Sequence, residues 1–126
     1  MGYIGNVPVD GVKTYKLKTN GAMPASSGTP DTLYTVPAGT TTVVIGLTLA
    51  NIDTSSVTAT VQIVSTTVDT ETNETVNVIK DVPILAGASL ELMNGNQYVL
   101  QAGDVIKIDC GTTAKLDATL SVMEMI

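Results

Sequence analysis

One short segment of this chain groups enough oxygen ligands to suggest metal chemistry. Asp69, Glu71 and Glu74 surround Asn73, and carboxylate and amide oxygens are the ligands that Ca²⁺ prefers. A calcium loop of the EF-hand type needs glycine at its sixth position and glutamate at its twelfth. Counted from Asp69, those positions hold Glu74 and Lys80. We therefore interpret residues 69–74 as an exposed acidic loop and predict no metal site, with a weak surface calcium site as the open alternative.

The rest of the chain lacks the residue types on which most catalytic sites depend. It has no histidine, so the usual general base near neutral pH and the Ser–His and Cys–His nucleophile pairs are missing. The one cysteine, Cys110, shares its alternating face with Ile106 and Ile108 and is expected to be a buried small hydrophobic residue. A glycosidase needs only two carboxylates, but no tryptophan is present to hold a sugar ring. We predict a protein that is not an enzyme, with no catalytic residue and no cofactor.

Charge and composition argue against several classes of partner. The 126 residues carry twelve acidic side chains and six lysines, for a net charge of −6. Nucleic-acid-binding proteins gather cations on one surface, whereas the one basic cluster here, Lys13, Lys16 and Lys18, is typical of a solvated strand face. The N-terminal residues lack the charged and apolar regions of a signal peptide, and no apolar run is long enough to span a membrane. We expect a soluble protein, made in the cytoplasm, with no nucleic-acid or membrane partner.

Strand-forming residues dominate the elements that would position any site. Hydrophobic residues make up 44% of the chain, yet phenylalanine and tryptophan are absent, so valine, isoleucine, leucine and threonine must fill the interior. Branched side chains of this kind favour pleated sheets. Alternation is explicit at 57–63, where every second residue is apolar, and no window shows a sustained helical period. Strands are predicted at 32–36, 41–50, 56–65, 75–81, 89–93, 97–100, 104–110 and 114–123.

Tight turns separate these strands. Three corners carry Ala-Gly between a strand end and the next strand: Pro37–Thr40, Leu85–Ala88 and Gln101–Asp104. A fourth signal, Asn94-Gly95, predicts a hairpin between 89–93 and 97–100. Eight short strands joined in this way predict an all-β fold, with residues 32–126 forming a single β-sandwich of jelly-roll or immunoglobulin-like type.

Residues 1–31 differ from this body. Glycine and proline interrupt them every few residues, and only 12–18 has the pattern of a short strand. The segment lacks the apolar residues for a core of its own, so we predict an extended N-terminal arm. The arm is either a frayed terminus or a segment that becomes ordered against a neighbouring subunit.

Two stretches are predicted to contact other chains. In the last strand, Met123 and Met125 alternate with the core-facing residues, so an outer face that should be polar becomes apolar at its end. Either that strand is covered on both sides or these methionines meet another subunit. The predicted subunit contacts are three residues of the arm and three at the C-terminus: Tyr3, Ile4, Tyr15, Met123, Met125 and Ile126.

The corners of residues 32–126 resemble those of small virion structural proteins of tailed bacteriophages. In that group a Tyr-Thr-Val-Pro-Ala-Gly corner, here Tyr34–Gly39, opens a β-sandwich, and an Ala-Gly-Asp corner, here Ala102–Asp104, leads into the closing strands. The first residues, Met1–Pro8, resemble the start of tail-fibre proteins of marine and cyanobacterial phages, where this segment attaches to the particle. No long fibre shaft or receptor-binding domain follows them here.

The resemblance implies a structural role in a virion. It points to a capsid decoration or cement protein that stabilises the head, forms a homo-oligomer with a trimer favoured, and contacts the phage major capsid protein or tail proteins. The alternative that it leaves open is a tail accessory or tail-fibre adaptor protein. A carbohydrate-binding module is a third reading, and the scarcity of aromatic residues counts against it.

Overall fold

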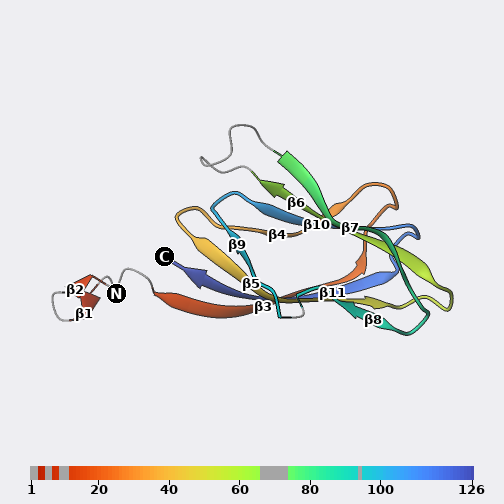
Figure 1. Ribbon diagram of the computed structural model, residues 1–126, viewed down its shortest axis with the longest axis horizontal. Coiled ribbons are helices and arrows are strands. Elements are labelled where there is room, and N and C mark those ends of the chain that lie inside the picture. Colours follow the sequence, from red (N-terminus) through yellow and green to blue (C-terminus); the bar gives the residue numbers. More distant parts are fainter. Residues whose placement is uncertain (1–2, 5–6, 9–11, 66–73, 94) are drawn as a thin grey trace.

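The computed structural model describes residues 3–4, 7–8, 12–65, 74–93 and 95–126. Within these ranges the chain consists of strands and turns, and Figure 1 shows two sheets packed one above the other. The prediction of an all-β sandwich is confirmed. No helix long and apolar enough to cross a bilayer occurs in the described part of the chain.

The upper layer in Figure 1 is a four-stranded antiparallel sheet. Its order is β4 (Asp31–Thr35), β10 (Val105–Cys110), β6 (Val57–Ser65) and β7 (Glu74–Ile84). Buried and partly exposed residues alternate along β10 and along the first part of β6, from Val57 to Val61, as the sequence pattern predicts. The aliphatic residues of these two central strands therefore point toward the other layer.

The lower layer is a five-stranded antiparallel sheet. It runs from β3 (Lys13–Met23) through β11 (Leu116–Met125) to β5 (Thr41–Asn51), and β5 then pairs with both β8 (Ser89–Glu91) and β9 (Tyr98–Leu100). The remaining strands, β1 (Tyr3–Ile4) and β2 (Val7–Pro8), pair with each other.

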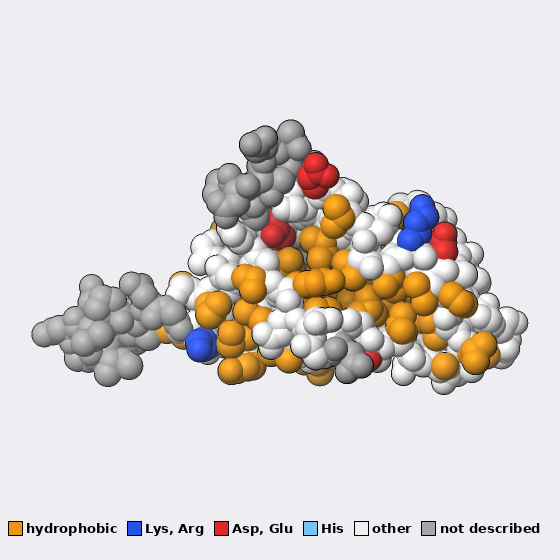
Figure 2. All heavy atoms as spheres, in the orientation of Figure 1, with side chains coloured by type: hydrophobic (Ala, Val, Ile, Leu, Met, Phe, Trp, Pro, Cys, Tyr) orange, Lys and Arg blue, Asp and Glu red, His pale blue; other side chains and the backbone are white. Residues whose placement is uncertain are grey.

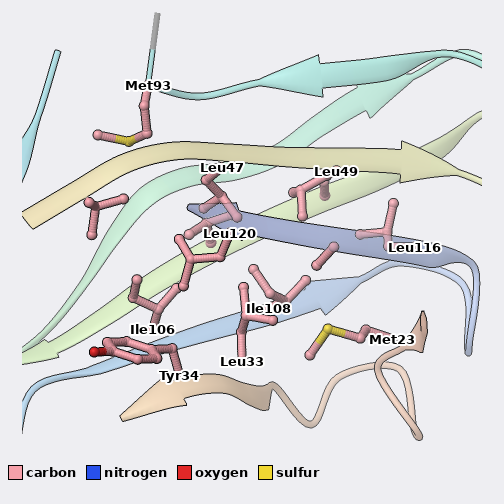
Figure 3. Close-up of a cluster of buried hydrophobic side chains, with 14 of the residues drawn as sticks. Met23, Leu33, Tyr34, Leu47, Leu49, Met93, Ile106, Ile108, Leu116 and Leu120 are labelled. Atoms are coloured by element: carbon pink, nitrogen blue, oxygen red, sulfur yellow. The ribbon is translucent and has the colours of Figure 1, made fainter. Parts of the chain in front are cut away.

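The core lies between the inner faces of the two sheets. Its most deeply buried side chains include Leu49, Ile108, Leu116 and Leu120, each at 0% exposure. Figure 3 shows these aliphatic side chains interlocking with Leu33 and Met23. From outside, the same layer is visible in Figure 2 as a band of hydrophobic side chains between the two sheets. Branched and unbranched aliphatic residues thus replace the missing aromatic rings.

The three Ala-Gly corners adopt one conformation. In each, the amide of the fourth residue donates to the carbonyl of the first, at 3.3, 3.0 and 3.0 Å for Thr40, Ala88 and Asp104. The third residue is glycine with φ of +70°, +72° and +90°, which is the geometry of a type II turn. The turn prediction from sequence is confirmed at all three positions.

The hairpin predicted at Asn94-Gly95 is wrong. Strands β8 and β9 do not pair with each other, because both lie along β5, β8 opposite 48–50 and β9 opposite 42–44. The glycine still makes a turn, with φ +81° and a hydrogen bond from the Asn96 amide to the Met93 carbonyl. The side chain of Met93 is buried at 5% exposure. Burial of Met93 therefore ties the connection to the core and leaves one edge strand broken in two.

The structure also differs from the predicted arm of residues 1–31. Residues 13–23 form an eleven-residue strand of the sandwich, paired with β11 from Lys13↔Met125 to Met23↔Leu116. Met23 is 1% exposed and belongs to the core. The pattern at 12–18 predicted the first part of this strand but not its continuation to Met23, because β3 is exposed along its whole length except at that last residue. A strand with two solvated faces has no hydrophobic alternation that would assign it to the sandwich.

The outermost strands on opposite sides of the sandwich, β3 and β7, each have a single fully buried residue, Met23 and Ile84, at their ends. The opposing sheet therefore leaves most of β3 uncovered. This is why lysines and threonines can occupy the inward side of β3, where a fully covered strand would hold aliphatic residues.

Candidate interaction surface

The structure gathers the predicted contact residues at one end of the five-stranded sheet. Tyr15 of β3 is the register partner of Met123 in β11, and Met125 lies two residues farther along the same face. Ile126, 75% exposed, follows directly at that end. Tyr3 and Ile4 form β1, and the prediction for their side chains lies outside what the structure describes.

An apolar row crosses this sheet from one edge to the other. Pairing places Tyr15 opposite Met123, Met123 opposite Val43, and Val43 opposite Val99. Directly paired residues of antiparallel strands share a face, and here it is the outer face, because the neighbouring residues Val44 and Val122 are buried. Tyr15 is 71% exposed and Val99 is 64% exposed. We call the row and its apolar neighbours the apolar face: Tyr15, Leu17, Val43, Ile45, Val99, Met123 and Met125.

The sequence did not predict the share of the apolar face that comes from Val43, Ile45 and Val99. These residues lie in three separate parts of the pattern and meet only through strand register. Ile45 reaches the outer face because a register shift falls between its neighbours Val44 and Gly46, as at a β-bulge. Local alternation carries no information on such pairings.

The equivalent row on the other sheet is polar. Across its four strands, pairing aligns Thr32, Lys107, Gln62 and Asn77. The amide of Gln62 donates to the Asn77 side-chain oxygen at 3.2 Å. A solvated outer face of an antiparallel sheet normally looks like this. The contrast marks the apolar face as the outer surface that favours being covered.

A polar cluster lies beneath the apolar face, between the two sheets. The hydroxyl of Tyr34 donates to the carboxylate of Glu124 at 2.5 Å and lies 2.8 Å from the Thr42 hydroxyl. The ammonium of Lys16 lies 2.8 Å from the other oxygen of Glu124. Glu124 is 7% exposed. The cluster joins β3, β4, β5 and β11, and so connects the edges of the two sheets.

The ionisation of this cluster follows from its contacts. The hydrogen bond from Lys16, and then that from Tyr34, lowers the pKa of Glu124 although burial acts in the opposite direction. Burial, together with donation to Glu124, raises the pKa of Tyr34 to about 12. Glu124 is therefore a carboxylate and Tyr34 a neutral phenol at neutral pH. Glu124 alternates with Met123 and Met125 and so lies on the core-facing side of β11, but the sequence gives no sign of these partners.

A groove of about 740 Å³ opens between the edge strands β3 and β4. Lys16 and Lys18 line its β3 side, Thr32 and Thr35 line its β4 side, and Glu124 is also among its lining residues. Apolar residues, among them Leu33, Pro37 and Val122, also line it. The groove is therefore mixed in character and slightly basic in a protein whose net charge is −6.

The remaining sequence predictions concern Cys110 and the acidic loop. Cys110 is 2% exposed and packs in the core, as predicted, and burial raises the pKa of its thiol. Of the acidic loop, Glu74 begins β7 and is exposed. Asp69, Glu71 and Asn73 lie outside the described residues, so the calcium question stays as the sequence left it.

Comparison with known proteins finds a likeness in structure but none in sequence. No protein-family model matches this chain, and no curated protein matches it in sequence. Among solved structures, the chain is similar to a chain in the structure of the infectious bursal disease virus Gx strain, with a TM-score of 0.46 and 14% sequence identity. The alignment covers 100% of this chain, which spans 37% of the length of that viral chain.

Proposed function

We propose that this chain is a structural protein of a tailed-bacteriophage virion, and specifically a decoration protein that stabilises the capsid. The observation that carries the proposal is the apolar row from Tyr15 through Met123 and Val43 to Val99, open on the outer face of the five-stranded sheet. Such a row gains free energy when another protein surface covers it, at about 25 cal/mol per Å² of apolar area. A protein that acts by binding other chains needs such a surface and needs no catalytic site.

The position of the row also supports the proposal. It spans four strands that are joined by strand pairing, so the surface is formed before binding. A preformed surface loses little conformational entropy on association. The corners at Tyr34–Gly39 and Ala102–Asp104, which resemble those of phage virion proteins, support placing the surface in a phage particle.

The proposed mechanism is stabilisation by selective binding. A protein that binds the assembled shell, and not its dissociated subunits, shifts the equilibrium toward the shell by mass action. The partners are then the major capsid protein and further copies of this chain, with a trimer as the proposed oligomer. No chemical step is required of any residue.

One substitution on the apolar row tests the proposal. Val99→Asp places a charge at the end of the row, on an exposed side chain, so the free energy of unfolding should change by less than about 0.5 kcal/mol. Loss of the apolar contact should weaken incorporation into particles about tenfold. Asn77→Asp is the matched control, because Asn77 ends the equivalent polar row. Competition between variant and natural protein during assembly, read by quantitative mass spectrometry, measures the effect.

The same mass spectrometry separates the head from the tail. A decoration protein should be present in many copies, in proportion to the major capsid protein, whereas a tail accessory or fibre-adaptor protein should be present in few. A low copy number would replace the decoration role with the tail role. Absence from purified particles, or equal incorporation of both variants, would contradict the proposal itself.

A further inference from the structure

A sandwich of two open sheets has four edges, and unpaired strand edges are templates for pairing with other chains. Most edges of this protein are interrupted. The pairing of the edge strand β7 with β6 shifts register on both sides of Val61 in β6. Strand β7 also has a positive φ of 52° at Asp81 and a proline at position 83. Bulges and prolines of this kind prevent a further strand from pairing.

Two more edges are short. Strand β4 has five residues, and its register shifts between Ile106 and Lys107 of its partner. The edge beyond β5 is divided between β8 and β9, of three residues each. Neither offers enough continuous backbone for a stable added strand.

The edge of β3 is long and uninterrupted. From Lys13↔Met125 to Asn20↔Ala118, eight consecutive residues pair with β11 without a register shift. Within the described ranges, β11 is the one strand that pairs with β3, so its other edge stays open. Tyr15 and Leu17, at 71% and 65% exposure, stand on the outer face of this edge. A long, exposed edge with apolar side chains is the geometry that accepts another strand.

The two faces of β3 present different chemistry. Tyr15 and Leu17 continue the apolar face, with Lys13 at its end opposite Met125, whereas Lys16 and Lys18 point to the groove on the inner side. The ammonium of Lys16 is held by Glu124. Lys18 has no ion pair within the part of the chain that the structure describes. The groove therefore carries a net positive charge from the side chains that line it.

We propose that the free edge of β3 binds an extended strand from a partner chain in which apolar residues alternate with carboxylates. An added strand lies about 4.8 Å away, and its side chains alternate between the same two faces as those of β3. Its apolar residues then lie beside Tyr15 and Leu17 and extend the apolar face. Its carboxylates point to the groove, within reach of Lys18 and Lys16.

The lysines also select against a second copy of β3. Pairing of two β3 edges would bring Lys13, Lys16 and Lys18 of both copies onto one short two-stranded ribbon, where like charges repel. An acidic strand would instead place carboxylates near the same lysines, where opposite charges attract. The edge is therefore specific for a partner of opposite charge.

This inference rests on the proposed contact-forming role and adds the chemistry of the partner. The test uses the full chain and a synthetic peptide, acetyl-Thr-Val-Glu-Val-Glu-Val-Thr-amide, with a peptide in which lysine replaces glutamate as its control. Calorimetry measures binding, and amide hydrogen exchange by NMR locates it. We expect the acidic peptide alone to bind and to protect amides of residues 13–19, with weaker binding at high salt.

Charge reversal on the protein completes the test. Lys18→Glu should weaken binding of the acidic peptide about tenfold. Lys80→Glu, an exposed lysine on the interrupted edge strand β7, should leave it unchanged. Equal binding of the two peptides, no binding of either, protection of β4 or β7 in place of β3, or self-association through β3 would each overturn the inference. Particle incorporation is measured separately, so the proposed function stands or fails independently of this result.

Discussion

At the scale of single residues, the most informative side chain is that of Glu124. It is a carboxylate on the core face of β11, and it is retained there because Tyr34 and Lys16 supply hydrogen bonds to both oxygens. A buried carboxylate without partners would cost several kcal/mol. Its partners come from β3 and β4, so the ionised state of this side chain depends on the junction of the two sheets.

Glu124→Gln should lower the free energy of unfolding by an amount that depends on pH. Because the pKa of Glu124 is lowered in the folded protein, its contribution is complete above the ordinary glutamate pKa of about 4.3 and is lost as the pH falls through the lowered value. Lys16 is half-exposed, so we expect the substitution to cost only about 1–2 kcal/mol near neutral pH. Urea unfolding should show this difference shrinking below about pH 4. A difference that stays constant with pH would contradict the ionised pair.

Tyr34 should limit stability on the alkaline side. Its pKa is raised to about 12 in the folded protein, against about 10 for an unfolded tyrosine. The contribution of the neutral Tyr34 side chain to the free energy of unfolding is therefore complete below about pH 10. It is up to about 2–3 kcal/mol, and it is lost as the pH rises toward 12. An absorbance titration should show one tyrosine ionising at about pH 12. Tyr34→Phe should abolish that step, and its persistence in the variant would show that another tyrosine is responsible.

At the scale of elements, the unexpected result is that β3 belongs to the sandwich. Met23 ends the strand inside the core, at 1% exposure, and the preceding residues hold the edge of the five-stranded sheet. Removing residues 1–11 should therefore leave the described sandwich folded, whereas removing 1–23 should destabilise it strongly.

Met23→Ala tests the same element with a single change. Large-to-small substitutions of buried methionine cost about 2–5 kcal/mol, and Met23 is surrounded by core residues. Leu17→Ala is the matched control, because Leu17 lies on the same strand at 65% exposure. Chemical unfolding of both variants gives the comparison. A cost for Met23→Ala as small as that for Leu17→Ala would show that β3 is not anchored in the core.

These elements show where sequence reasoning succeeds. Strong alternation located β6, β10 and β11, because each has one buried and one solvated face. The Ala-Gly corners were predictable because a positive φ at the third turn residue favours glycine. The full length of β3 was not predictable, since an edge strand without a buried face has no periodic signal. The strands β8 and β9 were located, but their separate pairing with β5 was not predictable, because local patterns do not encode which strands pair.

The candidate surface was predictable only in part for the same reason. Tyr15, Met123 and Met125 were found because an apolar side chain on an otherwise polar face is unusual. Val43 and Val99 join them through pairings between strands distant in sequence, which local patterns do not encode. The polar partners of Glu124 come from β3 and β4, and they meet it only through the packing of the two sheets.

At the scale of the whole molecule, the edge strand β3 connects these observations. Both of its faces are exposed, it borders the groove beside β4, and its Tyr15 and Leu17 continue the apolar face. On the other sheet, the row from Thr32 through Lys107 and Gln62 to Asn77 is polar, with the pair Val64 and Val105 beside it. The apolar row that crosses a whole sheet is thus found on the five-stranded sheet.

The central claim is that the apolar face is covered by another protein chain in a phage particle. A cryo-electron microscopy map of the particle tests it most directly, because the sandwich and its two distinguishable sheets can be placed in the density. We predict that Tyr15, Met123, Val43 and Val99 lie against a neighbouring chain while the row containing Gln62 and Lys107 faces solvent. A particle in which the apolar face is open to solvent, or from which this chain is absent, would contradict the account.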